Sequence, residues 1–483
     1  MSPARPAKNA AAALLVLLAS CGGPDPVHAP PEVTNEERAF GAEQHPRLLA
    51  EFGGEYRGGE ARYVAAVGER MAGAAGLADR CTFTLINSPV VNAFAVPGCY
   101  IYVTRGLVAA VTSEAELASV IGHEVGHIVG RHAQRQERRS VWRNLGVLAV
   151  GLTGSERLTR LAGQAAQLFG LRYSRRQEYE ADDLGIRYLR EAGYDVHAAA
   201  DMLAALGRHE AFMTRTEGRD AARSIPEWTR SHPLTGNRIG RAREAAAATG
   251  LADDALPERA QAYLTEVDGL LYGDDPEQGF VIGRRFAHPV MRIFFEAPPG
   301  FSLTNSPQAI RLTGPDGVAG EFGGGALPPG GLPAYAERLA AQVLGQTPAR
   351  TVDARPAIIN GLPALLVQLE IAARDGAVPL SIACYDGGGG EAYHFLIAAP
   401  PGHAGAVEAL FSSFRRLGDE EAARLRPRVI RTVPVAPGDT LDTLARRTAD
   451  PDPRALFLLL NGLVPGQPLE RGARVKLVAY AGT

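Results

Sequence analysis

Hydrophobic positions in the first half of the chain follow mainly a helical period. Residues 120–128 place apolar side chains at this spacing and predict a largely buried helix. A second helix is expected over residues 173–190, and Gly193 marks its end. Residues 92–96 and 100–104 instead alternate on either side of a Pro-Gly pair, which predicts two short strands. The pattern predicts a mainly helical domain with a small β-sheet at its edge.

The stretch between the two predicted helices has a mixed pattern. Residues 145–171 are largely apolar, but several glycines and charged residues interrupt them. These interruptions make the stretch a poor candidate for a membrane span. We therefore predict a helical hairpin or a lid between the two helices.

After about residue 277 the pattern changes to short apolar runs separated by turn residues. Two helical segments interrupt these runs, so we expect an α+β domain with an antiparallel sheet over residues 277–420. The strand candidates are residues 289–295, 309–313, 364–372, 379–385 and 392–398, and the helix candidates are residues 332–344 and 403–414.

The last segment predicts a small βααβ domain over residues 430–480. A strand-like run is followed by two short helical segments, residues 441–447 and 453–460. A closing strand is expected within residues 469–478.

The length of 483 residues is too great for one domain. We expect the helical domain over residues 37–255, a linker over residues 256–276, and then the two smaller domains. The chain carries 50 basic and 53 acidic residues, a net charge of −3. This balance argues against nucleic acid or another polyanion as a partner.

The N-terminal residues are typical of a bacterial export signal. Basic residues precede an apolar run in residues 1–20 that is too short to span a bilayer. The run ends just before Cys21, in a sequence that resembles a lipoprotein cleavage site. We expect lipidation of Cys21, a flexible tether over residues 21–36, and an outer-membrane lipoprotein facing the periplasm. A soluble periplasmic protein is the alternative.

The most specific chemical signal is the HExxH sequence formed by His123, Glu124 and His127. Residues four apart share one face of a helix, so both imidazoles can reach one metal ion. Glu124 is then placed to act on water, as in zinc peptidases. A surface helix with two solvated histidines is the alternative, but the apolar flanking residues argue against it.

Carboxylates on the second predicted helix can complete the metal site. Glu178 and Asp182 are four residues apart and share a face, whereas Glu180 points roughly the opposite way. One carboxylate can bind the metal while the other fixes a histidine ligand by hydrogen bonding. The spacing does not decide between them. His132 lies well round the helix from His127 and is predicted to be structural.

Four segments together resemble the M48 family of zinc metallopeptidases, the Ste24, HtpX, Oma1 and BepA type. They are NAFAVPG at residues 92–98, HEVGH at residues 123–127, the ExxAD core at residues 178–182, and SHP at residues 231–233 followed by Arg238. They occur in the family's order, across roughly residues 37–250.

The resemblance implies a zincin-like fold and one Zn²⁺ per chain. By this resemblance His123, His127 and Glu178 are the zinc ligands, and Glu124 is the general base and acid. Asp182 supports a ligand, and His232 stabilises the oxyanion or gates the metal. A substrate peptide is expected along an edge strand, with Asn92, Ala93, Phe94, Ala95 and Arg238 as substrate-binding residues.

The C-terminal segment resembles a LysM module. The resemblance rests on the PGDTL sequence at residues 437–441 and the LNGL sequence at residues 460–463. Such modules bind the glycan chains of peptidoglycan, so peptidoglycan is a candidate partner. A purely structural or protein-docking role is the alternative.

We therefore expect a zinc endopeptidase that cleaves misfolded or stalled envelope proteins. A periplasmic chaperone or assembly factor for outer-membrane proteins, using the same cleft with little turnover, is the alternative. Cys81 and Cys99 are expected either as a disulfide or as two buried thiols, and the sequence does not decide between these.

Overall fold

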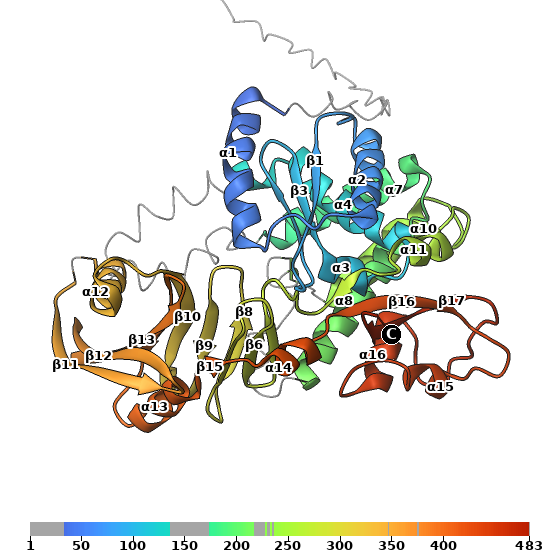
Figure 1. Cartoon of the computed structure of the whole chain (residues 1–483). Coiled ribbons are helices and arrows are strands. Elements are labelled where there is room, and N and C mark those ends of the chain that lie inside the picture. The colour runs from blue at the N-terminus through green and yellow to red at the C-terminus, as the bar shows by residue number, and fades with distance from the viewer. Residues whose placement is uncertain are drawn as a thin grey trace, which may run out of the picture.

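The computed structural model describes residues 33–135, 173–216, 228, 232–233, 236–345, 347–373 and 376–482. Cys21, the predicted signal, most of the predicted tether and the predicted hairpin or lid at residues 145–171 lie outside these ranges. Figure 1 shows a mainly helical part, a part dominated by β-sheet, and a C-terminal unit beside the helical part. The fold is thus multidomain, with helices first and large antiparallel sheets later.

The first part is built from helices that surround one apolar core. Ser113 caps the start of α4 by accepting a hydrogen bond from the Glu116 amide. Ser174 and Gln177 form a capping box at the start of α7, and Gly193 ends this helix in the left-handed conformation. The helices are α1 (Asn35–Glu51), α2 (Gly59–Ala74), α3 (Arg105–Ala110), α4 (Glu114–Val129), α7 (Arg175–Ala192), α8 (Ala198–Thr216), α10 (Gly236–Ala248) and α11 (Ala260–Glu266).

A small sheet lies against these helices. β1 (Thr82–Ile86) pairs in parallel with β3 (Tyr100–Thr104), and β3 pairs antiparallel with β2 (Ala93–Val96). β2 is therefore an edge strand, and the two strands predicted around the Pro-Gly pair are confirmed. A disulfide joins Cys81 to Cys99, which lies in the turn between β2 and β3.

Close packing of α4 against α7 depends on glycine. A Cβ atom added at Gly126 would lie 3.0 Å from the carbonyl oxygen of Ala181, and one added at Gly185 would lie 3.3 Å from the amide nitrogen of His123. Larger side chains at these positions would separate the helices. The glycines thus let the metal-binding faces of the two helices meet.

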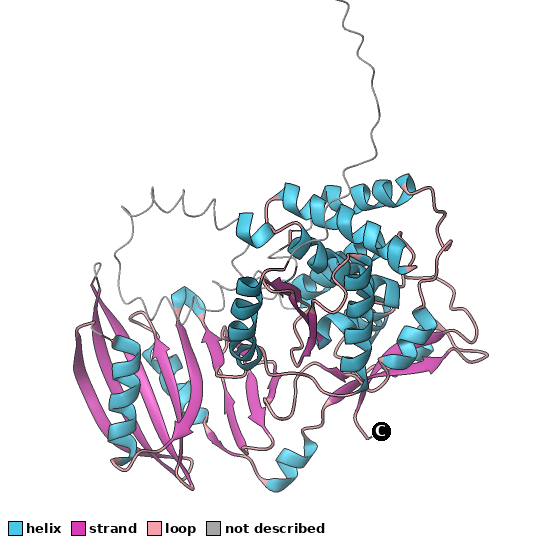
Figure 2. Ribbon diagram, turned by 90° about the horizontal axis from the view of Figure 1, so that it is seen from above, coloured by secondary structure: helices cyan, strands magenta, loops and turns pink. Residues whose placement is uncertain are grey.

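The middle part contains two antiparallel sheets (Figure 2). The seven-stranded sheet has the order β11 (Ala349–Ile359), β12 (Leu362–Ala373), β13 (Gly376–Gly388), β14 (Glu391–Ala398), β10 (Ala319–Ala326), β9 (Ile310–Thr313), β8 (Ser302–Asn305). The four-stranded sheet has the order β15 (Arg415–Arg416), β7 (Ile293–Glu296), β6 (Arg285–His288), β5 (Phe280–Ile282).

Helices cover both faces of the seven-stranded sheet. Ile382 on β13 packs with Tyr335 of α12 (Gly331–Leu344), whereas its neighbour Ala383 belongs to the core that contains Phe411 of α13 (Ala404–Ser413). Successive strand residues point to opposite faces, so the two helices lie on opposite sides. The expected α+β architecture of this part is confirmed. A short 3₁₀ helix (Pro315–Gly317) and α14 (Asp419–Arg424) complete it.

One strand prediction in this part needs correction, and several strands were not predicted. The strand expected over residues 289–295 begins only at Ile293, because residues 289–292 turn and Arg292 adopts a φ of 53°. The strands that were not predicted are β5, β6, β8, β10, β11 and β15. The glycine-rich sequence of β10 and the exposed, charged sequence of β11 lack the alternation that marks a strand.

The C-terminal unit contains β16 (Arg428–Pro434), α15 (Leu441–Ala445), α16 (Pro453–Leu460) and β17 (Arg474–Tyr480). β16 pairs with β17 and also with β4 (Leu271–Tyr272), which lies in the segment predicted as a linker. That segment also contains α11, whose Tyr263 is fully buried in the core of the helical part. Residues 256–276 are therefore packed against the helical part and the C-terminal unit.

None of the described helices is long and apolar enough to cross a membrane.

Candidate metal centre

His123, His127, Glu178 and His232 converge in the interior of the helical part. Each side chain offers one ligand atom, and these four atoms lie within 4.8 Å of one another. The Nε2 atoms of His123 and His127 are 2.9 Å apart. The Glu178 carboxylate lies 3.6 Å from each of these nitrogens, through a different oxygen for each. Two imidazoles and a carboxylate, drawn from α4 and α7, therefore point at one position.

The arrangement fits a zinc ion. A tetrahedral zinc with ligand bonds of about 2.0–2.1 Å holds its ligand atoms about 3.3 Å apart. The distances of 2.9–3.6 Å among His123, His127 and Glu178 bracket this value. All three residues are at most 3% exposed. Buried imidazole nitrogens that face each other leave lone pairs without enough protons to share, and a cation satisfies them together.

Asp182 and Arg238 hold the ligands in place. The Asp182 carboxylate lies 2.9 Å from Nδ1 of His123, which directs Nε2 of that ring toward the centre. Arg238 pairs with Asp182 at 2.7 Å and with Glu178 at 2.8 Å. Burial opposes ionisation of Asp182, but the charges of Arg238 and His123 hold its pKa at about 2. Glu178 thus lies among the candidate ligands, and Asp182 supports His123. The spacing on α7 alone had not decided between these two roles.

Arg238 itself is buried, with 1% of its surface exposed. It was predicted to bind substrate, whereas its guanidinium contacts Asp182, Glu178 and the carbonyl oxygen of His232. The structure therefore directs Arg238 toward the metal ligands.

His127 is held in place by contacts on the side of its ring away from the ligand cluster. Its Nδ1 lies 2.7 Å from Nδ1 of His132, whose Nε2 is 3.5 Å from the Glu180 carboxylate. The ring of Tyr173 stacks on His127 with a centroid distance of 3.9 Å. Burial, followed by the neighbouring histidines, lowers the pKa of His127 well below its ordinary value, which favours the neutral form that binds metals. His132 and Glu180 therefore orient a ligand.

Glu124 lies at the edge of the ligand cluster, next to His232. Its carboxylate accepts a hydrogen bond from the Trp228 indole at 3.4 Å and lies 3.6 Å from Nε2 of His232. Burial raises the pKa of Glu124 above its ordinary value. A carboxyl group of this kind takes up and returns a proton more readily near neutral pH than an exposed glutamate does.

His232 lies within hydrogen-bonding distance of two of the predicted ligands, His123 and Glu178. Its Nδ1 is 3.0 Å from Glu178 and 3.3 Å from Nε2 of His123. Its ring stacks on Trp228 with a centroid distance of 4.9 Å. Burial opposes protonation, but the charges of Glu178 and Glu124 raise the pKa of His232. In this arrangement His232 takes the fourth place around the centre.

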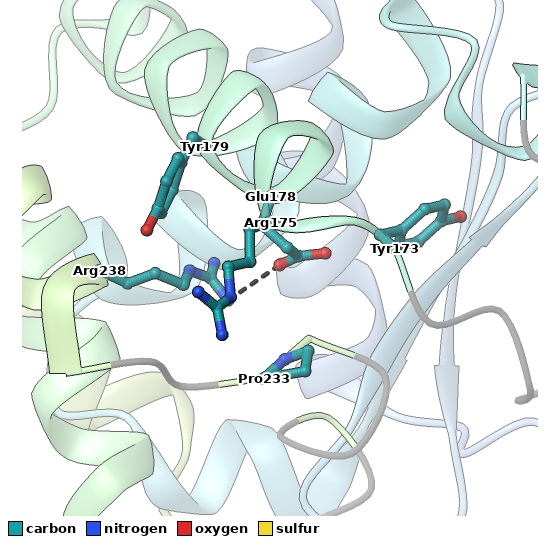
Figure 3. A pocket seen from close by; sticks show the side chains of 6 residues that line it. All are labelled: Tyr173, Arg175, Glu178, Tyr179, Pro233 and Arg238. Carbon is teal, nitrogen blue, oxygen red and sulfur yellow. Dashed lines mark ion pairs between the residues drawn. The ribbon is translucent and has the colours of Figure 1, made fainter.

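A cavity of about 190 Å³ opens beside Glu178 (Figure 3). Figure 3 shows Arg238 paired with the Glu178 carboxylate, and Tyr173 and Pro233 along the wall. The cavity connects one side of the ligand cluster to space large enough for several water molecules.

The other four predicted substrate-binding residues lie on or just before β2. Asn92 and Ala93 are buried, and the Asn92 main chain bonds to Thr104 in both directions. Phe94 and Ala95 are half-buried on the edge strand, which packs near α4. Among the described residues, the strand thus lies beside the ligand-bearing helix at the edge of its sheet.

Sequence reasoning missed two aromatic residues of the site, Trp228 and Tyr173. Neither residue lies in a motif, and both contacts join segments far apart in the chain. His132 was predicted to be structural and lies outside the ligand cluster, but its contact with His127 was not predicted, because a helical projection places it off the face that carries His123 and His127. After α4 ends at Val129, Arg131 takes a φ of 48° and turns the following residue back toward His127.

Several known metallopeptidases are similar to this chain in sequence. Residues 59–246 match the model of peptidase family M48. The chain is 37% identical over 124 residues to the mitochondrial metalloendopeptidase OMA1 of Arabidopsis thaliana, covering 26% of this chain and 25% of that protein. It is 30% identical over 196 residues to the beta-barrel assembly-enhancing protease of Yersinia pestis, covering 38% of each. The matches thus span well under half of these relatives.

Among solved structures, cyanobacterial PsbP from Synechocystis sp. PCC 6803 matches 29% of this chain and 98% of its own chain. The sequence identity is 14% and the TM-score is 0.23.

Proposed function

We propose that this chain, which carries a domain of peptidase family M48 at residues 59–246, is a zinc-dependent endopeptidase of the bacterial cell envelope. The observation that carries the proposal is the convergence of His123, His127 and Glu178 with Glu124 beside them. Two histidines and a glutamate are a ligand set of catalytic zinc.

The roles of the residues follow from their positions. A zinc ion bound there would act as a Lewis acid and lower the pKa of water. Glu124 accepts a proton from the attacking water and delivers it to the leaving amine. Asp182 and His132 keep the two ligand imidazoles in the orientation that presents Nε2. Arg238 neutralises the buried carboxylates around the centre.

We assign His232 the role of a gate. Catalytic zinc needs an open position, whereas Nδ1 of His232 lies within 3.3 Å of both His123 and Glu178. Movement of His232 away from the ligands would open the centre to water and substrate. A gate of this kind suits an enzyme of the envelope, because an open protease would damage folded neighbours.

The substrate is a misfolded or stalled envelope protein in this proposal. The position of β2 at the end of its sheet suits an extended peptide, which can add to a sheet through main-chain hydrogen bonds. Unfolded β-proteins expose such strands. The names of the Yersinia pestis and Escherichia coli relatives refer to assembly of β-barrels, which supports this class of client. The chaperone alternative predicts the same binding with little turnover.

The proposed location is the periplasmic face of the outer membrane, with Cys21 as a lipid anchor. The β16-α15-α16-β17 order supports the LysM-like assignment of the C-terminal unit, with peptidoglycan as its candidate partner. Co-sedimentation of the purified protein with sacculi tests the glycan partner. Metabolic labelling with a radioactive fatty acid, compared between the wild type and Cys21→Ala, tests the anchor.

The decisive experiment compares Glu124→Gln with a matched control, Glu191→Gln, which changes an exposed glutamate on α7. We expect about one zinc per chain in all three proteins and chelator-sensitive cleavage of casein by the wild type and the control. Glu124→Gln should keep zinc and lose cleavage by at least about 100-fold. Cleavage by a zinc-free preparation would refute the proposal. Full function of Glu124→Gln in cells would favour the chaperone.

A further inference from the structure

Lys476 is an unusual residue in this chain. The sequence contains two lysines, Lys8 and Lys476, and all its other basic side chains are arginine. Lys8 lies outside the described residues, so Lys476 is the only lysine in the described part of the chain. It lies in the middle of β17 and is completely buried. Lysine is almost never fully buried unless its ammonium is paired.

The partners of Lys476 belong to the helical part. Its Nζ donates hydrogen bonds to the carbonyl oxygens of Ala109 at 2.7 Å and Val111 at 2.6 Å. These carbonyls lie at the end of α3, just before α4 begins at Glu114. Main-chain carbonyls at a helix end have no partner within the helix. Lys476 supplies that partner from another part of the fold.

A buried carboxylate on α4 faces the same region. Glu116 accepts hydrogen bonds from the amide and the hydroxyl of Thr112, at 2.7 and 2.8 Å. Burial raises the pKa of Glu116, and the positive charge of Lys476 opposes this rise. Glu116 lies seven residues before His123, which is two helical turns along the same face of α4. The contacts of Lys476 therefore reach the start of the ligand-bearing helix.

The C-terminal unit presents Lys476 from a rigid support. The side-chain amide of Asn461, at the end of α16, bonds to both the amide and the carbonyl of Lys476. Ile430, Leu460 and Val478 belong to the same apolar core as Leu117 and Ile121 of α4. In Figure 1 the unit lies beside α3 and α8, and α16 contacts both helices. The unit and the helical part thus share one core.

We infer that the C-terminal unit is a brace of the peptidase domain, in which Lys476 positions the ligand-bearing helix α4 by bonding the turn that precedes it. The inference rests on the proposed function only for its effect on catalysis. Displacement of the unit, for example by a ligand bound to it, would release the start of α4 and loosen the metal centre. The brace thus offers a route by which the C-terminal unit regulates the active site.

Lysine suits this position better than arginine. Its ammonium is compact and has three donors, and two of them meet the two carbonyls. Arginine would bring five donors into a space with few acceptors. Lys476→Arg and Lys476→Met therefore test shape and charge separately.

The direct test uses Lys476 as a chemical probe in the full-length, zinc-loaded protein. An amine-acetylating reagent is applied at pH 8 to the native protein and to the urea-unfolded chain, and modification of Lys476 is followed by mass spectrometry. We expect modification to be at least about 100-fold slower in the native protein. Equal rates in the two states would overturn the inference. This measurement does not depend on peptidase activity.

The positioning role is tested by variants, at a temperature where each remains folded by circular dichroism. Lys476→Met should accelerate the removal of zinc by a chelator about tenfold and lower kcat with little change in KM. The control Arg471→Met removes an exposed charge from the same unit and should change neither. A folded Lys476→Met protein with normal zinc release would overturn the role, whether or not the wild type cleaves protein.

A second variant serves if Lys476→Met does not fold. Leu460→Ala keeps Lys476 but weakens the shared core, so Lys476 should be acetylated faster and zinc should leave faster together. Faster acetylation with unchanged zinc release would show that the unit does not brace the centre.

Discussion

Gly126 on α4 lies directly against the main chain of Ala181 on α7, so that an added Cβ atom would be 3.2 Å from the Ala181 Cα and 3.0 Å from its carbonyl oxygen. Gly126 also lies between the motif residues Glu124 and His127. The same contact therefore sets both the helix spacing and the distance between the histidines and Glu178.

Substitution of Gly126 by valine should separate the two helices. Overpacking of this kind costs about 1–3 kcal/mol. We expect at least about tenfold weaker zinc binding, because Glu178 would move away from both imidazoles. Gly73→Ala on α2 is the control, since nothing lies within 4 Å of its added Cβ. Competition with a zinc-binding dye measures the affinity. Equal zinc affinity of Gly126→Val and the wild type would contradict the packing argument.

Arg238 should matter for metal affinity more than for substrate binding. Arg238→Met leaves the carboxylates of Asp182 and Glu178 without their buried counter-charge. Loss of such a supporting contact weakens metal binding by about 10- to 100-fold. Arg241→Met is a matched control on the same helix, because its pair with Asp183 is exposed and contributes little. Titration with zinc, together with KM for a peptide, distinguishes this role from substrate binding, which would raise KM and spare zinc.

Removal of His232, the proposed gate, should increase the proposed peptidase activity. His232→Ala opens the fourth position while His123, His127 and Glu178 remain. We expect zinc to stay near one per chain and the cleavage of unfolded casein to rise above that of the wild type. His403→Ala, in the β-sheet part, is the control. A loss of about 100-fold in kcat with zinc retained would instead indicate an oxyanion-stabilising role.

The backbone strain at Cys99 can be measured separately from the effect of the disulfide. Cys99 has a φ of 62°, a conformation that glycine adopts without strain. In a background of Cys81→Ala, Cys99→Gly should be more stable than Cys99→Ala by about 1 kcal/mol. Both double variants should be less stable than the disulfide-bonded protein by about 2–4 kcal/mol. Urea unfolding measures the three free energies. A more stable alanine variant would argue against strain at this position.

The sequence predicted the parts of the site that lie within single helices. His123 and His127, or Glu178 and Asp182, are four residues apart, so helical geometry alone places each pair on one face. The resemblance to M48 peptidases then indicated which carboxylate binds the metal. Trp228 and Tyr173 reach the site through contacts that no local spacing encodes, so they could not be predicted.

The lack of a local sequence signal also explains the errors in the predicted fold. β12, β13 and β14 were predicted because each contains a short apolar run bounded by turn residues. β10 is rich in glycine and β11 is an exposed edge strand, so neither carries that signal. Residues 256–276 were predicted to be a linker, yet Tyr263 within this segment is buried in a core shared with distant segments. Such shared cores depend on tertiary packing, which a single sequence does not reveal.

Finally, burial of Lys476 should make stability depend on pH. Burial lowers the pKa of this lysine to about 7, below its ordinary value of 10.5, although the charge of Glu116 opposes the shift. Between these two values the unfolded chain binds more protons than the folded protein, so the free energy of unfolding rises with pH. The gain in the free energy of unfolding is complete above pH 10.5. It decreases as the pH falls and is lost as the pH falls through 7.

The neighbouring groups do not remove this expectation. Glu116 faces Lys476 from α4, and His209 faces it from α8, where burial and the charge of Lys476 lower the pKa of His209 to about 4. His209 is therefore neutral throughout the range of interest. Urea unfolding at several values between pH 7 and 9.5 should show a rising free energy for the wild type, by less than about 1.4 kcal/mol per pH unit. Lys476→Met should lack this component, and parallel profiles for the two proteins would show that Lys476 keeps its ordinary pKa in the folded state.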